Sequence, residues 1–158
     1  PAVGAGLDMA LMCDVRIAGE SAKLSESYFN AGIVPGDGGA YFLPPLVGRD
    51  RALDMFWPAR TVKGEEAERM GLVTRVVPDE ELDQFVEEYM QKLLEAPQQA
   101  MRLTKRAIHE SEQSTLRASL DMVSSFMGIV TELDDYRTRT AALVEKLEKK
   151  HKRKKKES

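Results

Sequence analysis

Residues 3–14 read VGAGLDMALMCD, a glycine-rich turn that leads directly into an apolar stretch. Glycine has no side chain, so the backbone of this turn can approach a bound group closely. The stretch from Leu7 to Met12 is rich in Leu, Met and Ala, which predicts a short helix after the turn. Free N–H groups at the helix start, together with the helix dipole, suit a negatively charged oxygen. The alternative is a tight strand-to-helix connection in which Asp8 only compensates the dipole.

A second glycine-rich stretch, residues 31–39, reads AGIVPGDGG. Pro35 fixes one backbone dihedral, whereas Gly36 and the two later glycines permit several conformations. This pattern predicts a loop before a helix that begins at Ala40. Asp37 stands just before that helix, where it either caps the helix N-terminus or adds a carboxylate to the wall of an active site.

The rest of the first half alternates between strand-like and helix-like segments. Strands are expected at 13–18 and 72–77, a short extended piece at 22–24, one helical turn at 25–28, and amphipathic helices at 49–57 and 63–70. Cys13 would be a small residue of the core in the first strand. The segment up to Pro78 therefore has the pattern of an α/β fold.

Beyond Pro78 the pattern is almost entirely helical. Asp79 is expected to be the N-cap of the first of these helices, and the last is expected to run from Glu132 to about Lys150. These helices are apolar on much of their surface. They therefore need partners to pack against.

Three ordered blocks carry a family resemblance. They are GAGLDMALMCDVRIAGESAKL, AGIVPGDGGAYFLPPLVGRDRALDM and GEEAERMGLVTRVVP. Together they resemble the crotonase (enoyl-CoA hydratase/isomerase) superfamily from about Val3 to Pro78, and more weakly to about Lys146. The resemblance implies an α/β fold in three parts: the C-terminal part of a crotonase-like ββα spiral at 1–78, a helical oligomerisation region at 79–148 and a basic, disordered tail at 149–158. It also implies that the chain is the C-terminal part of a longer protein.

The same resemblance assigns roles to particular residues. The backbone amide of Ala5 aligns with one of the two donors of an oxyanion hole. Asp8 aligns with the first carboxylate of the family, and Tyr28 aligns with the second, which is a glutamate in relatives. A further carboxylate that relatives use in the second glycine loop aligns with Gly36, one residue before Asp37. Asp8 paired with Asp37, or with a residue upstream of Pro1, is therefore expected to supply the acid–base groups.

Further residues are expected to lie near the substrate. They are Gly4, Gly6, Pro35, Gly36, Phe56 and Trp57. The last two fall on the helix that lines the acyl pocket in the family. As large aromatic residues at helical spacing, they equally fit a place in the core.

Composition sets outer bounds on the function. The chain has 158 residues, 42% of them hydrophobic and 31% charged, which is typical of one globular domain. A membrane span is not expected, because no apolar stretch reaches about 18 residues. Cys13 is the single cysteine and the two histidines are far apart, so neither a disulfide nor a metal site is expected. The basic run KKHKRKKK at 149–156 is read as a solvated tail, with polyanion binding as the alternative.

The implied function is that of an acyl-CoA thioester enzyme of the hydratase/isomerase type. Such an enzyme stabilises an enolate-like oxyanion with backbone amides, and a hydratase also needs a base and an acid. An isomerase can use a single carboxylate. The resemblance implies no cofactor beyond the coenzyme A of the substrate, and a homotrimer or hexamer. The cytoplasm is the expected compartment, with mitochondria as the alternative. The competing hypothesis is a catalytically degenerate crotonase-fold protein that assembles with partners or binds polyanions.

Overall fold

The computed structural model describes residues 1–154, and side-chain environments up to residue 152. The chain divides into two compact units, Pro1–Met90 and a second unit that begins at Gln91. The division falls within helix α5 (Leu82–Glu95), later than the change from alternating to helical pattern at Pro78.

Short strands of the first unit form two small sheets. They are β1 (Ala2–Val3), β2 (Ile17–Gly19), β3 (Lys23–Ser25), β4 (Thr61–Lys63) and β5 (Arg75–Val77). In one sheet β3 lies between β1, which is parallel to it, and β4, which is antiparallel. In the other, β2 pairs in parallel with β5. The register that places Val3 opposite Ser25 brings the first glycine turn next to the end of β3.

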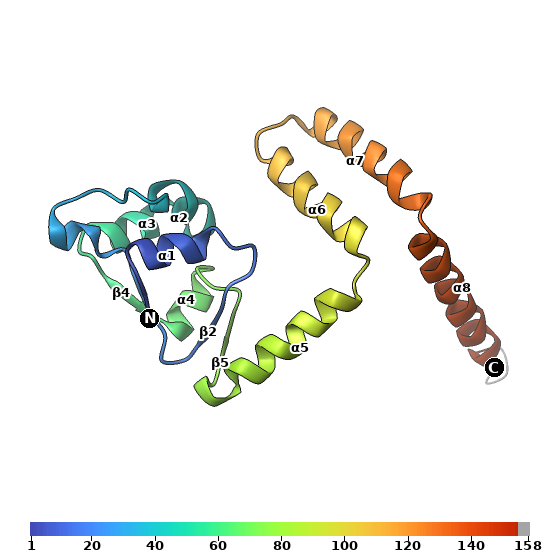
Figure 1. Ribbon diagram of the computed structural model, residues 1–158, viewed down its shortest axis with the longest axis horizontal. Helices are drawn as coiled ribbons and strands as arrows, with labels where there is room; N and C mark the ends of the chain where they lie inside the picture. Colours follow the sequence, from blue (N-terminus) through green and yellow to red (C-terminus); the bar gives the residue numbers. More distant parts are fainter. Residues whose placement is uncertain (155–158) are drawn as a thin grey trace. The chain divides into compact units, whose positions relative to one another are not determined.

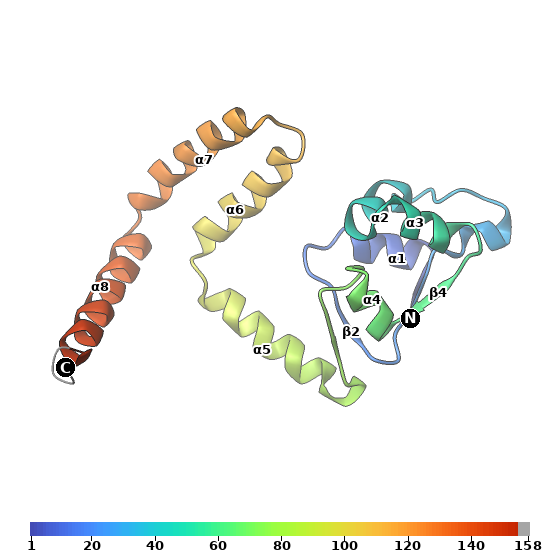
Figure 2. The same ribbon diagram turned by 180° about the vertical axis from the view of Figure 1, so that it is seen from behind.

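Helices cover these strands and enclose the core of the first unit. They are α1 (Ala5–Leu11), the 3-10 helix η1 (Ser27–Ala31), α2 (Gly39–Val47), α3 (Arg49–Phe56), α4 (Gly64–Arg69) and the 3-10 helix η2 (Asp79–Glu81). Figures 1 and 2 both show α2 beside α1, with α3 next along the chain. The α/β organisation expected from the sequence is therefore present.

The core forms because each helix places apolar residues on one face. Leu7 and Leu11 lie one turn apart on α1, and Leu43 and Val47 are spaced in the same way on α2. Buried residues from α3 and β4, among them Met55, complete the cluster. This packing fixes the position of the start of α1, where the first glycine turn lies.

Several boundaries differ from the sequence expectation. The strand expected at 13–18 begins only at Ile17, and Cys13 is exposed rather than in the core, because its N–H bonds to Ala10 O in the turn that ends α1. Similarly, the strand expected at 72–77 begins only at Arg75. The expected helices at 49–57 and 63–70 are confirmed as α3 and α4. Strand β4 was not expected.

Asp79 does not cap a helix. Its Oδ1 accepts a hydrogen bond from the N–H of Ser21 at 3.1 Å, and Pro78 is the N-cap of η2. Hydrogen bonding from Ser21 lowers the pKa of the Asp79 carboxyl. Asp79 therefore joins the segment before α5 to the turn between β2 and β3.

The second unit consists of helices joined by short turns. After the end of α5 come α6 (Gln98–Ser111), α7 (Leu116–Thr131) and α8 (Asp134–Lys154). Helices α6 and α7 form a hairpin, closed by a hydrogen bond of 2.6 Å between Ser111 Oγ and Ser119 Oγ (Figure 2). No side chain between residues 91 and 152 is buried. The described part of this unit has no core of its own.

The basic C-terminal run differs from its expected disorder. Residues 149–154 continue α8, with Lys149 Nζ 2.5 Å from Glu145 Oε1, and the remainder of the predicted tail, 155–158, lies outside the described residues. Throughout 1–154, no helix is both long enough and apolar enough to cross a bilayer.

Candidate active site

The first glycine turn leaves two backbone amides without an acceptor. Gly4 has φ +53° and ψ −124°, which a residue with a side chain rarely adopts, and its N–H bonds to Ser25 O at 2.8 Å. Its carbonyl accepts from Leu7 and Asp8, the first bonds of α1. Within residues 1–154 the N–H groups of Ala5 and Gly6 donate to nothing, and both residues are exposed. These amides are free to bind an anionic oxygen.

Two residues after Gly6, Asp8 is fully buried, at 0% exposure. Its Oδ2 accepts a hydrogen bond of 2.7 Å from the hydroxyl of Tyr28 in η1. The same hydroxyl lies 2.9 Å from Oδ2 of Asp37, which is exposed in the second glycine loop. The phenol of Tyr28 thus lies between two carboxyls, that of Asp8, 20 residues earlier in the sequence, and that of Asp37, 9 residues later.

This arrangement limits where protons can be. A phenol carries one proton, so Tyr28 donates to one of the two carboxylates at a time. Its oxygen can then accept a hydrogen bond from the other carboxyl only if that carboxyl is protonated. The three groups therefore form a path along which a proton can pass between buried Asp8 and exposed Asp37.

Asp37 does not cap α2, so the first of the two sequence interpretations is wrong. Gly38 is the N-cap of α2, and it makes no side-chain capping bond. The helix begins at Gly39 and continues through Pro44 to Val47. Asp37 is instead held by Tyr28.

Glu26 is a further member of this cluster that the sequence analysis did not select. It lies between β3 and η1 and is fully buried, at 0% exposure. Burial raises the pKa of its carboxyl to about 8, and the charge of neighbouring Asp8 contributes to this rise. No local pattern in the sequence signals its burial.

Gly39, the first residue of α2, allows the carboxyls to approach the backbone. A Cβ built on this residue would collide with Asp8 Oδ1 and would stand 3.1 Å from Glu26 Oε1. Only a residue without a side chain fits here unless the carboxyls move. The second glycine loop thus contributes backbone space as well as Asp37.

The phenol of Tyr28 is expected to resist ionisation. Burial raises its pKa, and the hydrogen bonds to Asp8 and Asp37 raise it further. Because this pKa lies above the value of about 10 in an unfolded chain, the stabilisation from Tyr28 is intact below pH 10 and is lost as the pH rises further. In an ultraviolet titration, one of the four tyrosines should ionise only with unfolding, and Tyr28→Phe should remove that step.

The control for this titration is Tyr41→Phe, because Tyr41 is 65% exposed. This variant should keep the late step. Reversible ionisation of all tyrosines of the folded protein near pH 10 would contradict the prediction.

The other residues expected near a substrate are dispersed. Phe56 is buried in the core, whereas its neighbour Trp57 is exposed. Pro35 is half-buried, and Gly36 is exposed. Within residues 1–154, no group of three or more His, Cys, Asp or Glu side chains is arranged to hold a metal ion.

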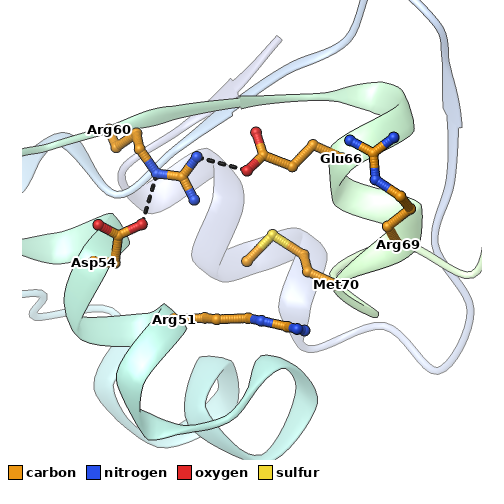
Figure 3. A pocket seen from close by; sticks show the side chains of 6 residues that line it. All are labelled: Arg51, Asp54, Arg60, Glu66, Arg69 and Met70. Atoms are coloured by element: carbon orange, nitrogen blue, oxygen red, sulfur yellow. Dashed lines mark hydrogen bonds and ion pairs between the residues drawn. The ribbon is translucent and has the colours of Figure 1, made fainter.

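A charged cavity of about 360 Å³ lies elsewhere in the first unit. Its lining residues, drawn in Figure 3, are Arg51, Asp54, Arg60, Glu66, Arg69 and Met70. Arg60 joins two of them, with Nη1 donating to Glu66 Oε1 at 2.6 Å and Nε 2.9 Å from Asp54 Oδ2. Arg69 pairs with Glu65. This cavity contains an ion-pair network between α3 and α4, and none of the carboxyl cluster lines it.

The family model described as enoyl-CoA hydratase/isomerase matches residues 1–154. A crotonyl-CoA hydratase of Syntrophomonas wolfei is 34% identical over 145 residues, which are 92% of this chain and 56% of that protein. The chain thus spans about half the length of this relative.

Solved structures give the same result. An enoyl-CoA hydratase from Bacillus anthracis superposes with a TM-score of 0.87 at 35% identity, covering 92% of this chain and 56% of the other. A Thermobifida fusca protein solved in complex with acetoacetyl-CoA has a TM-score of 0.80 at 34% identity, covering 84% of this chain and 52% of that one. The fold of this chain is therefore one that solved structures already show.

Proposed function

The chain belongs to the enoyl-CoA hydratase/isomerase family, and from this membership we propose that the whole protein is an enzyme acting on acyl-CoA thioesters. The observation that carries the proposal is the phenol of Tyr28 between Asp8 and Asp37. Three groups that exchange a proton, next to free backbone amides at the start of α1, suit a reaction through an enolate. The family resemblance recognised in the sequence is confirmed.

The amide of Ala5 is proposed to bind the thioester oxygen. Support comes from its position at the first turn of α1, where its N–H has no acceptor within residues 1–154. Charge that develops on the thioester oxygen in the transition state is stabilised by a donor already in place, and one such donor is typically worth a factor of about 10²–10³ in rate. Gly4 and Gly6 on either side leave room for the ligand.

Hydration is the proposed reaction. Water gives a proton to Asp37 while its oxygen bonds to the β-carbon of the enoyl thioester. The enolate that results, held at the Ala5 amide, then takes this proton from Asp37 at the α-carbon, so that Asp37 returns to its ionised state. Between the two steps Tyr28 can pass the proton on to Asp8 and return it. Asp37 is assigned the role nearest the substrate because it is exposed, whereas Asp8 is fully buried.

Isomerisation is the alternative within the same family. It moves one proton between two carbons of the acyl chain, and the exposed Asp37 alone would suffice to remove and return it. Tyr28 in place of the second glutamate favours this alternative, since a phenol with a raised pKa is a poor base.

Turnover of a short enoyl-CoA by the full-length protein tests the proposal. A hydratase should remove the ultraviolet absorbance of the conjugated thioester, and an isomerase should generate it from a non-conjugated 3-enoyl-CoA. The control is a variant shortened after Glu148, which should retain turnover if the basic run takes no part. A full-length protein without activity on both substrates would refute the proposal and favour the degenerate crotonase-fold alternative.

A homotrimer or hexamer is proposed as the working assembly. Support comes from the second unit, which has large exposed apolar side chains and no buried one between residues 91 and 152. Leu116 is 76% exposed and Leu94 is 63% exposed. Burying such side chains in an interface removes apolar surface from water, which is favourable.

A further inference from the structure

Glu26 is a buried acid for which the proposed reaction has no direct use. It follows β3 and precedes η1, and this position fixes its backbone. Neither of its side-chain oxygens finds a hydrogen-bond donor within residues 1–154. An ionised carboxylate buried in this way is strongly disfavoured, because it has lost water and gained no donor. The side chain therefore requires a proton.

The group that faces it is Asp8. Oδ1 of Asp8 is also buried without a donor in the described chain. Because both Asp8 Oδ1 and Glu26 Oε1 converge on the same point above Gly39, the two carboxyls lie against each other. Two negative charges placed in this way repel, whereas one proton between them makes a charge-assisted hydrogen bond.

The surroundings decide which of the two carries the proton. Asp8 already accepts a hydrogen bond from Tyr28 on Oδ2, which favours its ionised form. Glu26 has no such donor, and burial raises the pKa of its carboxyl to about 8, with the charge of Asp8 contributing. The titratable groups that act on Glu26 are thus Asp8 directly, and Tyr28 and Asp37 through Asp8.

We infer that Glu26 is a positioning residue, a neutral carboxylic acid whose O–H donates to Asp8 Oδ1 and holds Asp8 ionised against Tyr28. The inference rests on the proposed function, because Asp8 affects turnover only if the Asp8–Tyr28–Asp37 path carries the proton. Glu26 does not touch the substrate. With a permanent donor on Oδ1, Asp8 stays stabilised when the Tyr28 proton turns toward Asp37.

A spectroscopic test does not depend on activity. In infrared difference spectra at neutral pH, the carbonyl band of a protonated carboxylic acid should be present in the full-length protein and absent from Glu26→Gln. The control, Glu80→Gln, replaces an exposed glutamate and should leave the band unchanged. A band that persists in a folded Glu26→Gln protein would overturn the inference.

A second measurement covers the case in which Glu26→Gln does not fold. In wild-type protein with ¹³C-labelled glutamate side chains, one carboxyl carbon should titrate near pH 8, far above the ordinary value of about 4.3. If every glutamate titrates near the ordinary value, the inference fails.

Kinetics then test the positioning role. The amide of Glu26→Gln can still donate to Asp8, so this variant should keep kcat at pH 7, whereas Glu26→Leu has no donor and should lose roughly ten- to a hundredfold in kcat. Wild-type kcat should fall as the pH rises through about 8, because Glu26 then ionises beside Asp8. Glu26→Gln should lack that limb.

The outcomes separate this inference from the proposed function. Equal kcat for Glu26→Leu and wild type would overturn the positioning role while leaving the function standing. If the full-length protein has no turnover on either enoyl-CoA substrate, the proposed function fails, and the positioning role fails with it. The infrared band would in that case still report the protonation of Glu26.

Discussion

Replacing Asp8 by asparagine is expected to lower kcat of the full-length protein by about 10²–10⁴-fold, the usual contribution of a positioned acid or base. The amide of asparagine cannot take up a proton, so the path from Tyr28 to Asp8 ends at Tyr28. KM should change little, because Asp8 is fully buried and does not contact a bound substrate in the proposed arrangement. The measurement is the loss of ultraviolet absorbance of a short enoyl-CoA, with circular dichroism to confirm folding.

The matched control for this prediction is Asp50→Asn. Asp50 also lies in the first turn of its helix, α3, but it is exposed. The control therefore removes a charge from a helix start without touching the cluster, and its kcat should stay within a factor of about two, as for most surface substitutions. Turnover that survives Asp8→Asn and Asp37→Asn together would show that the acid–base groups are assigned wrongly.

Substitution of Gly39 by alanine is expected to disable the site by steric displacement. The added methyl group would collide with Asp8 Oδ1 and press on Glu26 Oε1, so both carboxyls must move out of line with Tyr28. The free energy of unfolding should fall by about 1–3 kcal/mol, the usual cost of overpacking, and kcat should fall at least tenfold. Urea unfolding and the enoyl-CoA assay measure the two effects.

Gly128→Ala serves as the control for Gly39→Ala. Gly128 lies inside α7, and a Cβ at this position meets no atom within 4 Å. Alanine should therefore stabilise the helix slightly, by up to about 1 kcal/mol. If Gly39→Ala behaves like this control in both assays, the close approach of Asp8 to α2 affects neither the stability nor the turnover.

The fold could be predicted from the sequence to the extent that local pattern determines it. The helix after the first glycine turn, and helices α3 and α4, follow from the spacing of apolar residues and from capping glycines such as Gly71. The strands were less predictable, because each is two or three residues long and exists through its pairing partner. Strand β4 shows this best, since its three residues are paired with β3 and only Val62 among them is buried.

The candidate site divides in the same way. Asp8 and Asp37 stand in glycine-rich turns, a local feature that the sequence displays. The contact of Tyr28 with both of them, and the burial of Glu26, depend on how η1 packs against α1 and the second glycine loop, which no local pattern encodes. Cys13 and Asp79 were misassigned for different reasons. The N–H of Cys13 bonds locally to Ala10 in the turn that ends α1, where a strand was expected. Asp79 instead accepts a hydrogen bond from Ser21, 58 residues earlier in the chain, in place of a capping bond.

The lack of buried side chains between residues 91 and 152 has a consequence for folding and assembly. Helices α6 and α7 meet each other but leave every side chain from 91 to 152 at least partly in water, so their persistence depends on whatever surface covers them. In the proposed trimer or hexamer, assembly of this unit would depend on protein concentration, whereas the first unit has a core of its own.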